Sequence, residues 1–372
     1  MKSKRDIYCD YEFWNSFFEL ESVIIKDRKK RCRWDSFCGF LTSNNLYFNI
    51  SRCQILEDTD GGNALFDLCQ QRGGAGIKFI PQEFPQIQEL NDNDDDRLNS
   101  VFLTTKKEEE CKFLSSQFGV LVFNLEMVFS SEHVFKDNGQ AFTKENGKNW
   151  NYLFEFKGKC PSISCCNSLV IVDRYILADT NENVLNANLK PIFSALLPDA
   201  LANHIVFTIC IVAQKMGNNI NGKLDRIKKL VRQIRPNLVF CINIFGTRQL
   251  HDRTILTNNI MLSSGAGFDV IGTNEEPLKF TTTSLVFPFF RLDKKESENY
   301  LEWINNVLRE EQKCRSYQEN YWGEESIKHH LLDYYYEEPI IPKASYSIGD
   351  TLSAKLLSAL QFPSAATPNN SL

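Results

Sequence analysis

Short apolar runs alternate with amphipathic segments from residue 168 onward, and this alternation limits the possible folds more than any other feature. The runs 168–177, 205–213 and 238–245 are largely apolar, and the first is interrupted by the charged pair Asp173-Arg174. Strands that are buried on both faces give continuous apolar runs, whereas strands with one wet face alternate apolar and polar residues. The sequence therefore predicts an α/β fold in which helices cover both faces of a sheet.

The remaining segments extend this prediction in both directions. Downstream we expect strands at 250–256, 260–263 and 284–290, and helices at 189–197, 224–234 and 298–311. Upstream we expect a helix at 11–25, strands at 46–50 and 76–80, and a strand–helix–strand unit at 100–103, 107–117 and 120–124. The polar stretch 132–150 is interpreted as a loop or exposed helix. The predicted domains are an N-terminal α/β domain of unknown type (1–150), a second α/β domain (165–310) and a C-terminal extension with a disordered end (311–372).

Composition narrows the classes of function. The net charge of −5 provides no overall positive field for nucleic acid or membranes, so any anion site must be local. The 12 cysteines show no repeated zinc spacing, and Cys210 and Cys241 fall in apolar runs, so we predict no metal, no cofactor and a reducing cytoplasm. The first ten residues do not resemble a signal peptide, and no apolar run reaches the length of a transmembrane helix.

Two octets of the sequence resemble each other. HDRTILTN spans His251 to Asn258, and VDRYILAD spans Val172 to Asp179; they share Asp, Arg, Ile and Leu at four of eight positions. A charged pair in an apolar strand is costly unless something meets the charge. We therefore predict that the two octets form adjacent strands, related by a pseudo-twofold, on either side of one site.

The second octet carries the residues best suited to phosphate. Side chains alternate along a strand, so His251 and Arg253 share a face. An arginine offers a planar fork of donors to phosphate oxygens, and a histidine can attack phosphorus or transfer a proton. The turn Ser263-Ser264-Gly265 follows, where glycine allows close approach of the backbone to a ligand. The alternative is that Arg253 forms a structural ion pair with Asp252 or Asp269.

At these residues the chain resembles the phospholipase D superfamily, whose signature His-x-Lys-x-x-x-x-Asp usually occurs twice in each active site. His251, Arg253 and Asn258 are similar to that signature, with Arg in place of Lys and Asn in place of Asp. A closer resemblance is to the phospholipase-D-like C-terminal domain of MIT-domain proteins, and it covers about residues 165–310. It implies a mixed sheet and assigns the residues as follows: catalytic His251, Arg253 and Asn258; phosphate-binding Arg174, Arg253, Ser263, Ser264 and Gly265; supporting Asp173, Asp252, Asp179 and Asp269.

The first octet departs from that signature because Val172 occupies the place of the second histidine. We therefore favour a binding module with a degenerate phosphodiester site, whose ligand is a phosphorylated molecule, nucleic acid or a partner protein. The alternatives are a metal-independent nuclease that acts through His251, with His204, His329, His330 or the other subunit of a homodimer as partner, in a bacterial antiviral defence setting; or a structural subunit of a larger assembly. The best surface for nucleic acid is the predicted helix that carries Lys223, Arg226, Lys229 and Arg232.

Overall fold

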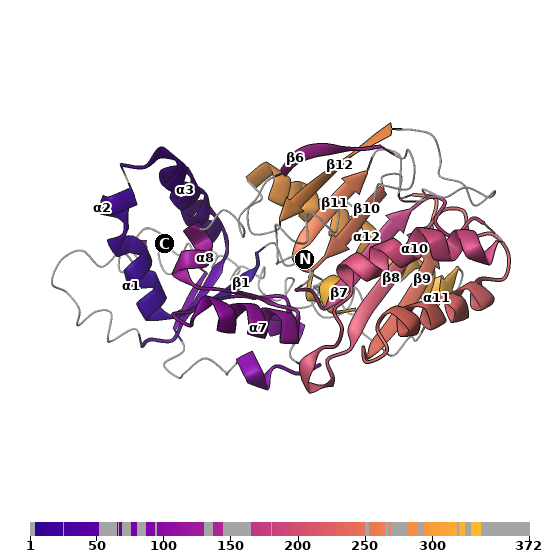
Figure 1. Ribbon diagram of the computed structural model, residues 1–372, viewed down its shortest axis with the longest axis horizontal. Helices are drawn as coiled ribbons and strands as arrows, with labels where there is room; N and C mark the ends of the chain where they lie inside the picture. Colours follow the sequence, from indigo (N-terminus) through magenta and orange to yellow (C-terminus); the bar gives the residue numbers. More distant parts are fainter. Residues whose placement is uncertain are drawn as a thin grey trace, which may run out of the picture.

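The structure is a computed structural model that describes residues 4–24, 26–51, 65, 67–68, 76–79, 87–93, 95–129, 137–143, 165–179, 181–249, 253–264, 268, 281–288, 294–317, 320–323 and 329–335. The fold is α/β, as predicted. Its described strands form two sheets, one entirely parallel and one mixed. Figure 1 shows the two sheets side by side, each with its own helices.

The N-terminal sheet has the strand order β3-β2-β1-β4-β5, with all neighbours parallel. Its strands are β1 (Asp6–Cys9), β2 (Asn45–Phe48), β3 (Ile77–Phe79), β4 (Val101–Leu103) and β5 (Leu121–Phe123). The helices around it are α1 (Tyr11–Glu19), α2 (Glu21–Ile24), α3 (Arg28–Ser43), η1 (Ile87–Glu89), α6 (Asp95–Leu98), α7 (Glu108–Phe118) and α8 (Leu125–Phe129).

An aromatic cluster fills the core of this first unit. Trp14 packs edge-on to Phe48 at 5.1 Å between ring centroids, and Phe17 stacks on Trp34 at 5.6 Å. Offset and edge-to-face ring pairs add to the apolar burial. The predicted elements of this region are present, but the central strand β1 lies in the charged opening segment, for which the sequence predicted no strand.

The second sheet has the order β13-β9-β8-β7-β10-β11-β12-β6, parallel from β9 to β7 and antiparallel elsewhere. Its strands are β6 (Asp137–Thr143), β7 (Ser168–Asp173), β8 (Phe207–Ala213), β9 (Phe240–Gly246), β10 (Arg253–Thr257), β11 (Ile260–Ser264), β12 (Thr281–Pro288) and β13 (Tyr321–Trp322). Its helices are α10 (Glu182–Leu196), η4 (Ala202–His204), α11 (Ile220–Ile234), α12 (Lys294–Tyr317) and α13 (His330–Tyr335).

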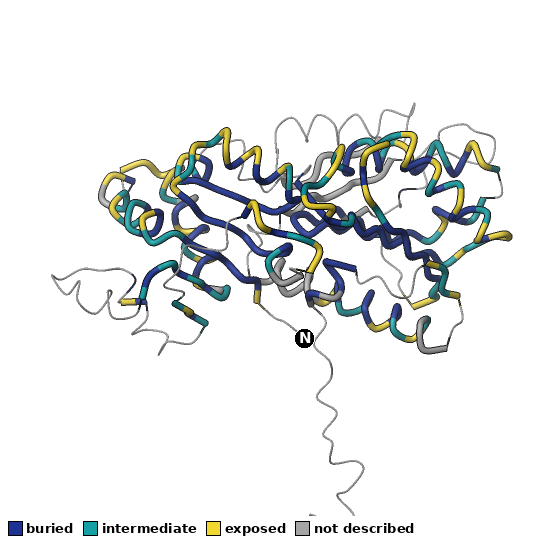
Figure 2. Tube along the Cα trace, turned by 90° about the horizontal axis from the view of Figure 1, so that it is seen from below, coloured by how far each residue is buried: buried dark blue, intermediate teal, exposed yellow. Residues whose placement is uncertain are grey.

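Helices cover both faces of this second sheet, as the continuous apolar strands predicted. Leu169 and Ile171 of β7 pack with α10 and α11, whereas Val170 and Val172 pack with α12 and α13. Figure 2 shows the central strands as buried and the outer turns of the helices as partly exposed. Such two-sided cover is what allows parallel strands to be apolar at every position.

Two predicted boundaries are wrong. Strand β6 lies within 132–150, the stretch predicted to be a loop or helix, and it pairs with β12 of the second sheet, so the chain leaves the first unit before residue 137 rather than at 150. The segment after 310 is also not a separate extension where the structure describes it. Strand β13 extends the second sheet next to β9, and α13 packs on β7. Strand β6 is too polar, and β13 and α13 are too short, to show a hydrophobic period in the sequence.

A buried polar joint connects the two units. The Arg5 side chain donates from Nη2 to Asn259 Oδ1 (3.0 Å) and from Nε to Asn99 O. From α13, the His330 carbonyl accepts from Asn99 Nδ2 (2.8 Å), and the Tyr334 hydroxyl accepts from Asp6 N (3.0 Å). Buried polar groups need such partners, so the joint fixes how the two units meet.

Candidate phosphate-binding site

The strands that carry the two octets are adjacent, although only Val172 and Asp173 of the first octet lie in β7. Strands β7 and β10 are antiparallel neighbours, with Thr254 opposite Val172 and Thr257 opposite Leu169. Continuing this register by one residue puts Arg253 opposite Asp173, with Cα atoms about 5 Å apart. On its other side, Arg253 pairs with Ser264 of β11. Three of the predicted site positions (Asp173, Arg253 and Ser264) therefore form one row across the edge of the sheet.

The first octet does not continue as a strand. Strand β7 ends at Asp173, and the residues from Arg174 to Ala178 form a turn, so the predicted strand 168–177 is four residues too long. The buried carboxylate of Asp173 holds this turn by accepting from Tyr175 N (2.8 Å) and Ile176 N (3.1 Å), and it also accepts from Phe268 N (2.5 Å). An aspartate that bonds the main chain two residues ahead competes effectively with a strand ladder.

The predicted pseudo-twofold is therefore wrong at the level of the backbone. In the second octet, Arg253 to Thr257 form β10, whereas the equivalent residues of the first octet lie in a turn. Arg253 alternates onto the face of Ile255, which packs toward α10 and α11. Arg174 lies beyond the end of its strand. The two arginines are therefore not symmetry equivalents.

Arg174 is half-buried at the edge of the sheet. Its guanidinium lies over the Tyr175 ring, 5.1 Å from the centroid, and its carbonyl accepts from Lys215 N. Its Nε is buried and has no hydrogen-bond partner among the described residues. A buried donor without an acceptor costs free energy.

Asn258 was predicted to be catalytic, and the structure corrects this. The residue is 1% exposed, donates from Nδ2 to Gly119 O (2.8 Å) and accepts at Oδ1 from Asn167 N (3.1 Å). Asn258 follows Arg253 by five residues, which corresponds to about 16 Å along an extended chain. Asn258 therefore belongs to the contact between the two units. Its counterpart Asp179 is half-buried and accepts from Asn181 N at the start of α10.

The histidines considered as partners for His251 lie at the other end of the sheet. His204 belongs to η4, just before the start of β8. His329 Nε2 lies 3.4 Å from Leu169 O near the start of β7, and His330 Nε2 lies 2.9 Å from Val206 O and 3.1 Å from Asp92 Oδ1. The His330 imidazole lowers the pKa of Asp92. His329 and His330 are buried and make structural hydrogen bonds, whereas His204 is exposed at the far edge of the sheet. All three lie away from Arg253.

Several predicted residues lie outside the described part of the chain. They are His251, Asp252, Gly265 and Asp269, and the side chains of Ser263 and Ser264. The backbone of the two serines belongs to β11, where Ser263 pairs with Thr254.

The basic helix α11 differs from the predicted nucleic-acid surface at its first turn. Lys223 is 2% exposed, and its ammonium donates to Leu177 O (2.5 Å) and Met216 O (2.9 Å). Burial lowers the pKa of Lys223, while the Asp179 carboxylate opposes this shift. Gly217 (φ 64°) has no room for a Cβ, which would lie 2.6 Å from Lys223 Nζ. Lys223 therefore anchors the turn of the first octet and is not available to a ligand.

The rest of α11 is only partly free. Arg226 forms an ion pair with Glu182 of α10, whereas Lys229 and Arg232 are exposed. Arg235, just past the helix, donates to Leu197 O and Ser194 O at the end of α10 (2.9 Å each). Carbonyls at the end of a helix lack intrahelical donors, so this arginine caps α10. The exposed positive charge of this surface is smaller than the sequence predicted.

No family model matches the chain, and no curated protein sequence matches it. Among solved structures it is similar to TrmBL2, an archaeal chromatin protein whose structure is described as showing a novel mode of DNA binding. The identity is 8%, the TM-score is 0.21, and the match covers 45% of this chain and 53% of that chain, so it spans about half the length of TrmBL2. A likeness this slight supports no inference about fold or function. None of the helices in the described part of the chain has both the length and the apolar character to cross a membrane.

Proposed function

We propose that the second unit is a phospholipase-D-like module with a degenerate phosphodiester site, which binds a phosphorylated ligand or nucleic acid. The observation that carries the proposal is the row in which Arg253 lies between Asp173 and Ser264, with Arg174 directly after Asp173 in the chain. Asp173 is bonded to three main-chain amides, so it orders the turn that presents Arg174. Two arginines at one sheet edge form a suitable fork for phosphate oxygens.

The departures from the phospholipase D signature favour binding over hydrolysis. Val172 takes the place of one histidine and is buried against α12 and α13. Loss of a general acid or base costs about 100- to 10,000-fold in rate. We therefore expect little or no phosphodiesterase turnover from the protein.

Binding is tested directly with two variants and a matched control. A fluorescently labelled 20-nucleotide single-stranded DNA or RNA is titrated with wild type, Arg174→Ala, Arg253→Ala and Arg309→Ala, the last on the exposed side of α12. We expect each of the first two variants to weaken affinity about tenfold, and Arg309→Ala to change it less than twofold. Circular dichroism and thermal unfolding monitor the fold. The proposal is overturned if wild type does not bind, or if both arginine variants bind like wild type while folded.

Hydrolysis is tested with the same substrates, with and without EDTA, for wild type and His251→Ala. Metal-independent cleavage that His251→Ala abolishes would contradict the binding-module proposal and make the protein a nuclease. The oligomeric state, measured by light scattering, separates a homodimer from a subunit that needs other partners.

The burial of Cys210 and Cys241 in strands fits the proposed cytoplasmic location, where such thiols stay reduced.

A further inference from the structure

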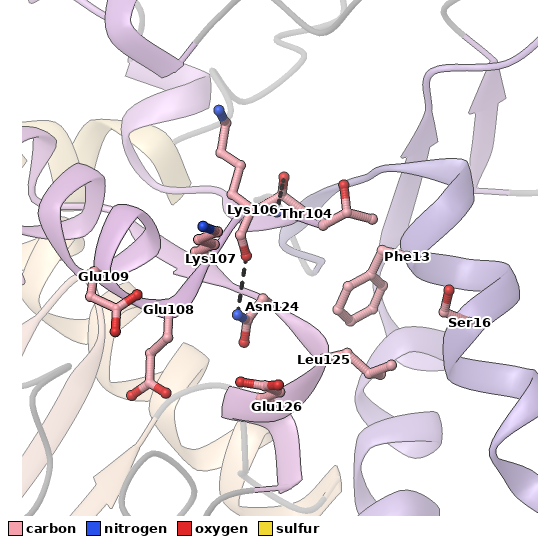
Figure 3. Close-up of a pocket in the computed structure, with 11 residues that line it drawn as sticks. Phe13, Ser16, Thr104, Lys106, Lys107, Glu108, Glu109, Asn124, Leu125 and Glu126 are labelled. Carbon is pink, nitrogen blue, oxygen red and sulfur yellow. Dashed lines mark hydrogen bonds between the residues drawn. The ribbon is translucent and has the colours of Figure 1, made fainter.

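A crevice opens in the first unit, far from the arginine row in sequence. Its volume is about 520 Å³, within the range of small-molecule sites. Figure 3 shows that its walls come from three elements: α1, the loop from β4 into α7, and the loop from β5 into α8. The lining includes Phe13, Lys107, Glu109, Asn124, Leu125 and Glu126.

The position of this crevice follows from the topology of the sheet. In the order β3-β2-β1-β4-β5 the chain leaves β1 toward one edge and β4 toward the other. The connections after these two strands therefore run to opposite faces and separate at the carboxyl ends. In open parallel sheets, ligands bind at this topological switch point. The crevice lies at that edge, between α1 and the start of α7.

Hydrogen bonds hold together the strand ends and loops beside the crevice. Asp10, directly after β1, accepts from Asn49 Nδ2 (3.1 Å) and from the Thr104 hydroxyl, so it joins the ends of three strands. Burial raises the pKa of Asp10, and the bond from Thr104 opposes this. Asn124, directly after β5, donates to Lys106 O (3.0 Å) and accepts from Met127 N (2.9 Å), which fixes both loops. A binding site is preformed when bonds of this kind hold the loops that carry its lining residues.

The chemistry of the walls excludes a dinucleotide or polyphosphate as the natural occupant. The turn from β1 into α1 contains Asp10 and Glu12 and no glycine, so it lacks the loop that wraps a pyrophosphate. The first turn of α7 consists of Glu108, Glu109 and Glu110. These carboxylates oppose the attraction of several negative charges to the helix N-terminus.

The remaining charges define a more specific ligand. Lys106 is paired with Glu110, and Lys112 with Glu108. Lys107, Glu109 and Glu126 form no ion pair among the described residues, so the crevice presents one cation and two anions to a ligand. Leu125 and Phe13 supply an apolar side (Figure 3). Positive and negative wall groups in one crevice match a small molecule that carries both charges.

We propose that this crevice binds a small zwitterion of the amino-acid or dipeptide class. Its carboxylate interacts with Lys107 and with the first-turn amides of α7, where Lys107 supplies no side-chain cap. Its ammonium pairs with Glu126, and its side chain packs against Leu125. The proposal is independent of the phosphate site on the second unit.

The probes separate the two charges of the ligand. The twenty common amino acids and their glycyl dipeptides are titrated into the full chain by calorimetry. The tightest of them is then compared with its N-acetyl form, which lacks the ammonium, and its amide, which lacks the carboxylate. We expect each modified form to bind at least tenfold more weakly than the zwitterion. AMP and inorganic phosphate serve as purely anionic probes.

Variants place the binding in the crevice. Glu126→Gln and Lys107→Ala should each weaken the tightest probe at least tenfold, while Glu302→Gln and Lys190→Ala, on exposed faces of α12 and α10, change it less than twofold. Arg253→Ala should have no effect, which separates this proposal from the phosphate site. The proposal is overturned if no zwitterion saturates below about 10 mM, if the N-acetyl and amide forms bind as well, or if AMP binds here instead.

Discussion

The two octets share Asp, Arg, Ile and Leu, yet the first turns away from its sheet and the second runs along it. In the first octet, Asp173 bonds the main chain ahead of it, and Ile176 and Leu177 both enter the core beneath α10 and α11. In the second, Ile255 enters that same core while Leu256 packs on the opposite face, toward α12. The same apolar residues are buried in both cases, by a turn in one and by strand alternation in the other.

The difference arises from the neighbours of each octet. Strand β10 has β7 on one side and β11 on the other, so its main-chain groups are satisfied by two ladders. Beyond Asp173 the first octet pairs with no strand among the described residues, and there the Asp173 side chain accepts from the amides instead. The residues that the octets share therefore did not determine their local structure. The hydrogen-bond partners available to each main chain did.

The largest effect is expected from removing the carboxylate that turns the first octet. Asp173→Ala leaves the amides of Tyr175, Ile176 and Phe268 without their acceptor, so the free energy of unfolding should fall by about 3 kcal/mol or more. Urea denaturation measures this, with Asp225→Ala on the exposed face of α11 as control. A loss below about 1 kcal/mol would mean that packing of Ile176 and Leu177 alone determines the turn.

A smaller effect should separate the last positions of the octets. Asn258→Ala removes buried bonds to Gly119 and Asn167, so we expect a loss of about 2 kcal/mol in the free energy of unfolding. The counterpart Asp179→Ala breaks one partly exposed bond to Asn181 N, with an expected loss of about 0.5 kcal/mol. Equal losses in the two variants would contradict the assignment of Asn258, and not Asp179, to the contact between the two units.

The last prediction concerns the anchor of the first octet, Lys223. Lys223→Met should lower the free energy of unfolding at pH 7 by about 1 kcal/mol, because two carbonyls lose their donor. Burial holds the pKa of folded Lys223 below its ordinary 10.5, so the unfolded chain binds more protons between the two values. Wild-type stability should therefore rise relative to Lys223→Met as the pH approaches 10.5. A difference that stays flat or falls over that window would contradict a buried ammonium.

The sequence predicted the α/β class, the adjacency of the octets and most central strands, because long apolar runs carry a clear signal. It did not predict β1, since Asp6–Cys9 is four residues long and follows a run of charges. Without β1, the strand order of the first sheet cannot be predicted, and neither can the crevice beside Phe13.

The site was predicted only in part for a related reason. The pairing of Arg253 with Ser264 follows from the short connection between the predicted strands 250–256 and 260–263. Lys223 and Asn258 can be buried because they donate to carbonyls of distant elements, Leu177 O and Gly119 O. No local sequence pattern predicts these long-range hydrogen bonds. A buried lysine and an exposed one look alike in a basic amphipathic helix.

The joint between Asp6 and Tyr334 has a consequence for synthesis. These residues are 328 positions apart, and a ribosome adds about 5 to 20 residues each second. Between about 15 and 70 seconds therefore pass from the emergence of Arg5 and Asp6 to the arrival of α13. Until then, the polar edge of the first sheet that carries Asp6 and Asn99 lacks its partners from α13. Whatever binds newly made chains meets that edge before the rest of the protein covers it.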